Sequence, residues 1–137
     1  MPTSLEELAI GQEIEPTVKH MTIERMSRPL MAGGNPLHHD AAFAKQAGLP
    51  APIATGVMSS AFLSEMLTKA FGVDWLRSGS IDVKFIQPIY AGDTVTARGR
   101  ITGKSETSTG VRMALEIWCE TQRGEPVTVG TASVVVH

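Results

Sequence analysis

The sequence is poor in cysteine and in long hydrophobic runs. Its single cysteine, Cys119, cannot form an internal disulfide, and this scarcity favours a reducing compartment, so we expect a cytoplasmic protein. No apolar run approaches the roughly 18 residues that a membrane span needs, so no membrane partner is expected. The first residues, MPTSLEELAIG, carry acidic side chains and no basic region, which is unlike a secretory signal.

The sequence also lacks an excess of charge of either sign. The 12 Lys and Arg residues nearly balance the 14 Asp and Glu residues, and the formal net charge is −2. Such a chain has no electrostatic footprint for nucleic acid, so no nucleic-acid partner is expected. There is no internal repeat, low-complexity tract or linker. With 137 residues, 42% apolar and 19% charged, the composition is typical of one globular domain over residues 1–137.

Two short helices are predicted in the first third of the chain. Thr22 is suited to cap a helix over residues 23–32, which Pro29 should kink or shorten. Asp40 is suited to cap a second helix over residues 41–47, because its carboxylate can accept from the first free N–H groups. Both helices flank a loop that is rich in glycine and histidine.

A longer helix is predicted over residues 57–71, with Thr55 as its cap and Gly72 as its stop. A helix that is apolar nearly all round is a buried helix, and its small residues permit close approach to a sheet. We therefore read this methionine-rich segment as core rather than as a cofactor site. Its expected core residues are Met58, Phe62, Leu63, Met66, Leu67 and Phe71.

The second half of the chain reads as strands. Apolar and polar residues alternate in SIDVKFIQP, and GDTVTARGRIT continues after a turn. VRMALEIWCET places Val111, Met113, Leu115, Ile117 and Cys119 on one face, and VTVGTASVVV closes the chain. One long buried helix among about five strands, mostly joined by hairpins, predicts an α+β domain in which a curved antiparallel sheet wraps a central helix.

Three stretches together resemble a known family. NPLHHDAAFA resembles an Asn-Pro-aliphatic-His motif that leads into a short helix, and APIATGVMSS resembles the entry to that family's central helix. SIDVKFIQPIYAGDTV resembles its strand with a Phe-x-x-Pro ending and a Gly-Asp turn. The family is that of the MaoC-like, (R)-specific enoyl-CoA hydratases, which have the hot-dog fold. The similarity runs from about Leu5 to the C-terminus.

The resemblance implies a lyase that adds water to, or removes it from, an acyl thioester linked to CoA or to a carrier protein. On its motifs, His38 is the acid/base and the Gly56 N–H is the oxyanion donor. Asn35, Thr55 and Phe85 are the corresponding candidates for substrate binding. No cofactor and no metal are expected.

The sequence departs from the family pattern at two positions. The family's Asp would fall at position 33, where this chain has Gly33, and Thr55 stands where a His is often found. A positioned acid or base contributes roughly 10²- to 10⁴-fold, so loss of the Asp costs about 3–5 kcal/mol of barrier lowering.

The other polar residues of the loop have simpler explanations. His39 is expected to face solvent, because adjacent side chains rarely aim at one point. Asp40 is expected to be a helix cap rather than a catalytic acid. The His-His-Asp run is not expected to bind metal, because the chain has no further ligand cluster. Cys119 lies in the apolar phase of a strand and is expected to be inert core.

Four functions remain open on the sequence. The chain is a hydratase or dehydratase, a catalytically degenerate subunit that supports an active partner, an enzyme that isomerises or cyclises an acyl thioester, or a thioester-binding module. Because a hot-dog sheet has an exposed edge, we expect a homodimer or a heterodimer with another hot-dog subunit.

Overall fold

The computed structural model describes residues 5–27 and 35–137. A five-stranded antiparallel sheet in the order β1-β3-β4-β5-β2 curves around one long helix, α4. The predicted α+β arrangement is therefore confirmed. The strands are β1 Thr17–His20, β2 Ser80–Phe85, β3 Thr94–Glu106, β4 Val111–Thr121 and β5 Pro126–Val136. The helical elements are η1 Leu5–Glu7, α1 Ile23–Met26, η2 Pro36–His38, α3 Ala41–Gln46, α4 Gly56–Phe71 and α5 Val73–Ser78.

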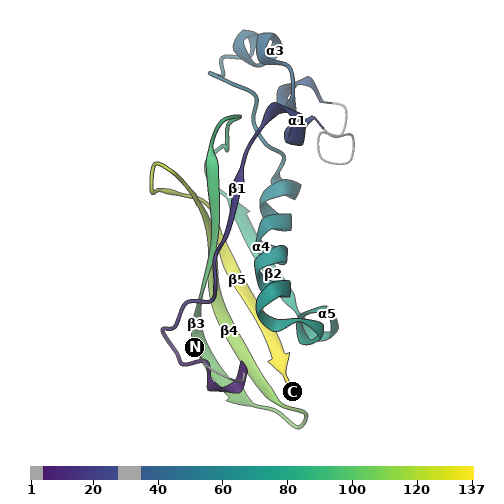
Figure 1. Ribbon diagram of the computed structural model, residues 1–137, viewed down its shortest axis with the longest axis vertical. Coiled ribbons are helices and arrows are strands. Elements are labelled where there is room, and N and C mark those ends of the chain that lie inside the picture. The colour runs from purple at the N-terminus through teal and green to yellow at the C-terminus, as the bar shows by residue number, and fades with distance from the viewer. Residues whose placement is uncertain (1–4, 28–34) are drawn as a thin grey trace.

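Helix α4 is the core of the molecule. Figure 1 shows it along one side of the sheet, with α1 and α3 beyond its N-terminal end and α5 at its C-terminal end. All the predicted core residues of this helix are buried. They pack on the face of the sheet that carries Ala97, Ile101 and Leu115. This burial, rather than helix propensity, holds α4 in place.

The strand pattern predicted from alternation is confirmed in β4. Met113, Leu115, Ile117 and Cys119 are buried and belong to the core, whereas the intervening residues are more exposed. Burial raises the pKa of the Cys119 thiol to about 11. Because the thiolate is the reactive form, this agrees with Cys119 as inert core.

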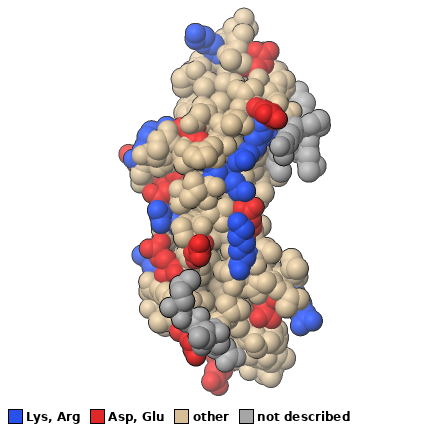
Figure 2. Space-filling model, viewed as in Figure 1, with Lys and Arg blue, Asp and Glu red and all other residues tan. Residues whose placement is uncertain are grey.

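Ion pairs join neighbouring strands on the outer face of the sheet. Arg98 contacts Glu120 at 2.6 Å, and Arg100 pairs with Glu116 and lies over the Trp118 ring at 5.8 Å from its centroid. Figure 2 shows basic and acidic side chains interspersed over the face in view. Such cross-strand pairs stabilise a solvated sheet surface by small increments.

The helix caps agree in part with prediction. Thr22 and Asp40 cap α1 and α3 by accepting from the backbone N–H groups of Arg25 and Phe43. Thr55 does occupy the N-cap position of α4, but its side chain makes no cap hydrogen bond, and the helix begins at Gly56. The first N–H groups of α4 are thus left without a side-chain cap.

Besides the short turns η1 and η2, one strand and one helix were not predicted, and one predicted helix is shorter than expected. The short edge strand β1 and helix α5 were missed, because β1 has four residues and α5 follows α4 directly after Gly72, at φ 60°. Helix α1 ends at Met26. The rest of the helix predicted over residues 23–32, from position 28 onwards, lies outside the described residues.

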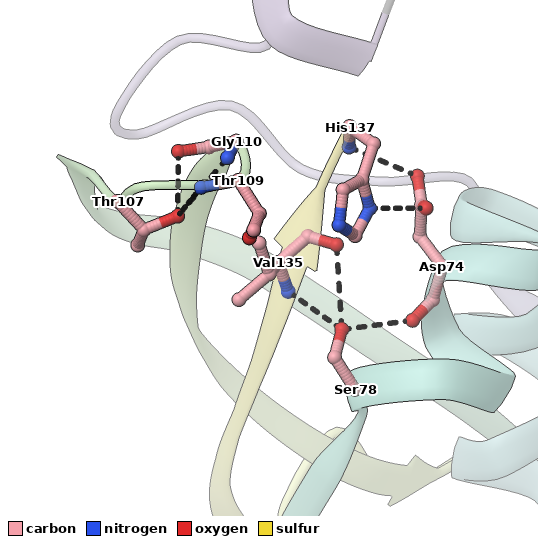
Figure 3. Close-up of polar contacts among 7 residues, drawn as sticks. All are labelled: Asp74, Ser78, Thr107, Thr109, Gly110, Val135 and His137. Atoms are coloured by element: carbon pink, nitrogen blue, oxygen red, sulfur yellow. Dashed lines mark hydrogen bonds and ion pairs between the residues drawn. The ribbon is translucent and has the colours of Figure 1, made fainter.

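Polar contacts fasten α5 to the end of β5, as Figure 3 shows. The Val135 N–H donates to Ser78 Oγ at 2.9 Å, and the His137 ring contacts the Asp74 carboxylate at 2.9 Å. The hydrogen bond from His137 holds the pKa of Asp74 below its ordinary value. Nearby, Thr107 and Gly110 close the β3–β4 turn, which Figure 3 shows beside the end of β5.

We expect truncation of the core of α4 to destabilise the protein strongly. Leu67 has no exposed surface, so Leu67→Ala should lower the free energy of unfolding by about 2–5 kcal/mol through cavity formation. Leu76→Ala on α5 is the matched control, because this leucine is 74% exposed and should change stability by less than about 0.5 kcal/mol. Urea unfolding measures both, and equal effects would contradict the burial of α4.

Candidate active site

A cavity of about 320 Å³ lies at the N-terminal end of α4. Its walls come from the segment before α4, the first turn of α4, the end of β2 with the loop that follows it, and β5. Most of the lining is apolar, with a few polar groups, which is the usual character of a small-molecule site. The lining residues are Ile53, Ala54, Thr55, Gly56, Ser59, Phe85, Ile86, Gln87, Pro88, Ile89 and Thr128.

The first turn of α4 brings free N–H groups to this cavity. The Met58 N–H donates to the Thr55 carbonyl at 3.1 Å, whereas the N–H groups of Gly56 and Val57 have no acceptor among the described residues. Free N–H groups at a helix N-terminus carry positive partial charge and suit a developing oxyanion. Gly56 also gives space, because a Cβ at this position would lie 2.8 Å from the Phe85 ring.

The loop after β2 holds the segment before α4 in position. The Ala54 N–H donates to the Ile89 carbonyl at 2.8 Å, and the Ala91 N–H donates to the Pro52 carbonyl at 2.9 Å. Ile53 forms an isolated bridge with Tyr90. These contacts fix the direction in which the chain enters α4.

Asp93 fastens that loop to the turn after β4. Its buried carboxylate accepts from both terminal nitrogens of Arg123, at 2.9 and 2.8 Å, and from the Gln122 amide and the Tyr90 N–H. Burial raises the pKa of Asp93, but these hydrogen bonds outweigh it and hold the pKa below its ordinary value of 3.8. The carboxylate is therefore ionised, and its hydrogen bonds hold the loop after β2 in position.

His38 is attached to the same entry segment. Its Nδ1 lies 2.8 Å from the Ile53 carbonyl oxygen, and the Ile53 N–H donates to the Leu37 carbonyl at 3.0 Å. Because a carbonyl only accepts, Nδ1 carries the hydrogen, and in the neutral ring Nε2 keeps its lone pair. The ring of the half-buried His38 is thus held in place, and its Nε2 has no hydrogen-bond partner among the described residues.

The comparisons with known proteins agree with this architecture. The sequence profile of the MaoC like domain matches residues 9–120. The chain belongs to the MaoC-like family. No curated protein sequence matches it significantly.

Solved structures show the same fold. The (R)-hydratase from A. caviae involved in PHA biosynthesis is 25% identical, with a TM-score of 0.80 over 96% of this chain and 99% of that chain. The unliganded R-hydratase PhaJ1 from Pseudomonas aeruginosa is 20% identical, with a TM-score of 0.82 over 97% and 84% of the two chains. The ChsH1–ChsH2 complex from Mycobacterium tuberculosis matches at 18% identity and a TM-score of 0.77, over 94% and 98%. The predicted hot-dog fold is confirmed.

In this MaoC-like domain, the structure brings some of the predicted site residues together. Thr55, Gly56 and Phe85 line the cavity. His38 is not among the lining residues and adjoins the cavity through Ile53. Asn35 is exposed, and its side chain accepts from the Leu37 N–H as the cap of η2.

The remaining positions of the loop complete this description. The substitution at Gly33 lies outside the described residues. His39 is half-buried and closes η2, with its N–H donating to the Pro36 carbonyl. The described residues include no cluster of three or more His, Cys, Asp or Glu side chains that could hold a metal ion, and no described helix is long and apolar enough to cross a membrane.

Sequence reasoning identified three of the eleven lining residues, and two of the eight that it missed, Ser59 and Thr128, carry hydroxyls. On the sequence alone, a small residue of α4 such as Ser59 indicates only close packing, and Thr128 is only part of a strand. Their hydroxyls form a hydrogen bond at 2.6 Å, and both residues line the cavity. The sequence signal that could have identified Ser59 is a hydroxyl among the apolar residues of the buried helix α4.

We expect Asp93 to make stability depend on pH. A carboxyl whose folded pKa is lowered stabilises the fold above its ordinary pKa, and the contribution is lost as the pH falls through the folded pKa. The wild type should therefore lose stability below about pH 4, and Asp93→Asn should lose less in that window. At pH 7, Asp93→Asn should cost about 1–3 kcal/mol.

Urea unfolding at several pH values measures this dependence. Glu15→Gln is the matched control, because Glu15 is exposed on the segment before β1. A wild type and an Asp93→Asn variant that lose stability in parallel below pH 4 would contradict the assignment.

Proposed function

We propose that this protein hydrates an enoyl thioester, or dehydrates a 3-hydroxyacyl thioester, linked to CoA or to a carrier protein. His38 acts as the acid/base, and the Gly56 N–H binds the thioester oxygen. Asn35, Thr55 and Phe85 contribute to the substrate site, with Asn35 acting through the η2 turn that it caps.

One observation carries this proposal. A basic imidazole and an uncapped helix N-terminus are fastened to one short segment beside one cavity. The carbonyl of Ile53 fixes the His38 ring, and Gly56 begins α4 three residues later. Addition of water to an enoyl thioester needs these two functions, a base for the water and a donor for the enolate oxygen.

The reaction balances with these groups alone. His38 Nε2 takes a proton from water as the oxygen bonds to C3, and the C2=C3 electrons move onto the thioester oxygen. The Gly56 N–H stabilises that enolate oxygen, and the positive end of α4 adds to this stabilisation. The imidazolium then returns the proton to C2. Dehydration follows the same steps in reverse.

The glycine at position 33 lowers the rate of the hydration reaction but leaves its sequence of steps unchanged. A carboxylate at this position would help to hold the water, and its loss lowers the expected turnover by about 10²- to 10⁴-fold. Catalysis by the base and the oxyanion donor survives, because groups that act as a unit are not additive.

The test compares three variants in hydration of crotonyl-CoA. His38→Asn keeps a side-chain N–H that can donate to the Ile53 carbonyl but has no basic nitrogen, so it should fold normally and lose at least ~10²-fold in turnover. His38→Ala should lose as much activity and also some thermal stability. His39→Ala is the control and should change turnover little.

Two outcomes would reject the assignment of His38. One is an equal or larger loss of turnover in His39→Ala than in His38→Asn. The other is a His38→Asn variant with undiminished activity. Absence of any turnover in the wild type, with crotonyl-CoA and longer enoyl-CoA esters, would reject the hydratase itself.

A second role, as one subunit of a hot-dog pair, is favoured by the free edge of the sheet. Strand β2 lies at one end of the strand order and is exposed at every residue except the half-buried Val83. Phe85 is 56% exposed and Ile86 is 48% exposed, and both line the cavity. An uncovered strand edge is a template for pairing, because its backbone N–H and C=O groups have no partner strand. We propose that β2 pairs with β2 of a second hot-dog subunit, identical or different.

Sedimentation velocity tests this pairing. The wild type should sediment as a dimer at micromolar concentration, and Ile86→Lys should shift it toward monomer. Leu76→Lys is the control, because Leu76 is exposed on α5 rather than beside β2. A monomeric wild type that gains no activity from another hot-dog subunit would reject both forms of the pair.

A further inference from the structure

A buried hydroxyl pair stands in the wall of the cavity where helix α4 meets strand β5. Ser59 and Thr128 are each 1% exposed, and the Ser59 hydroxyl donates to Thr128 Oγ1 at 2.6 Å. Both residues line the cavity. The pair therefore lies between the core and a ligand bound in the cavity.

The two hydroxyls of the pair cannot satisfy all of each other's hydrogen-bonding groups. Two hydroxyls carry two hydrogens, and one of them lies in the bond between Ser59 and Thr128. The Thr128 hydrogen has no acceptor among the described residues. Buried donors are nearly always satisfied, and the cavity is the open side of this residue. The spare hydrogen is thus suited to an oxygen on a bound ligand.

A second orphaned hydroxyl lies in the same wall. Thr55 Oγ1 is buried and has no hydrogen-bond partner in the described part of the chain, and Thr55 lines the cavity. Thr55, Gly56 and Ser59 therefore belong to the N-cap and first turn of α4, and Thr128 meets Ser59 from β5. A wall built for a plain alkyl chain would not be expected to carry these unsatisfied polar groups.

The spacing along the helix sets where a ligand oxygen would lie. Ser59 is three residues beyond Gly56, which is a rise of about 4.5 Å along the helix axis. In an extended acyl chain, the fifth atom lies about 5 Å from the thioester carbon, on standard bond dimensions. An oxygen near the fifth position of the acyl group matches this distance.

We propose that Ser59 and Thr128 select acyl groups that carry a hydrogen-bond-accepting oxygen near the fifth chain position, in preference to plain alkyl chains. This inference rests on the proposed thioester site. The physical reason is a difference in hydrogen bonding. A ligand oxygen accepts a hydrogen bond from the Thr128 hydroxyl, whereas an alkyl group excludes water and leaves that hydroxyl without a partner.

The test uses two esters that differ by one atom. trans-2-Hexenoyl-CoA is compared with 4-methoxycrotonyl-CoA, in which an ether oxygen replaces the fifth carbon. The wild type should favour the ether by about 10-fold in kcat/KM, the usual value of one net hydrogen bond. Thr128→Val keeps the shape and removes the hydroxyl, so the preference should disappear. Thr128→Ser should retain it.

Two further variants serve as a control and as a substitute in this test. Thr131→Val is the matched control, because Thr131 lies on the same strand and is exposed. It should keep the wild-type preference. Thr128→Ala replaces Thr128→Val if the valine variant does not fold, and it should lose the preference in the same way.

Binding separates this inference from the hydratase proposal. Isothermal titration with hexanoyl-CoA and 4-methoxybutanoyl-CoA, which cannot be hydrated, should show the same preference and its loss in Thr128→Val. That binding result without turnover would reject the hydratase and support the selectivity. Equal affinity for the two esters in the wild type, an unchanged preference in Thr128→Val, or no binding of either ester would overturn the selectivity.

Discussion

The burial of α4 against the concave face of the sheet is the constraint on which the rest of the structure depends. The helix is held by core side chains along its whole length, including Leu63, Met66 and Leu67. Because packing fixes the axis of the helix, the N–H groups of its first turn are held in a fixed orientation beside the cavity. A helix held by packing needs no side-chain cap, which leaves these N–H groups available.

The same geometry requires that the chain enter α4 in one direction. That direction comes from a set of short contacts between residues that are far apart in the sequence: Asp93 with Arg123, Ala54 with Ile89, and His38 with Ile53. The Asp93 carboxylate anchors the loop, the loop anchors the entry segment, and the entry segment orients the imidazole. The site is thereby built on the edge of a rigid core rather than on a free loop.

Polar groups in and around the cavity either have hydrogen-bond partners or lack them. The carboxylate of Asp93 is fully used, and the amide of Asn35 caps η2. The hydroxyl of Thr55 and one hydrogen of the Ser59–Thr128 pair are not used by the described residues. Because an unmade hydrogen bond in a buried place is costly, the spare groups indicate what the cavity is shaped to hold.

The sequence by itself determined the long buried helix, the faces of the strands, the caps at Thr22 and Asp40, and the family. These follow from periodicity and from short motifs, which act between residues close in the chain. Only the tertiary structure decided that Ser59 meets Thr128, that Asp93 meets Arg123, and that Thr55 leaves α4 uncapped. Ser59 and Thr128 are 69 residues apart, and no local pattern encodes such a contact. It exists because the sheet curves around the helix and brings β5 against its first turn.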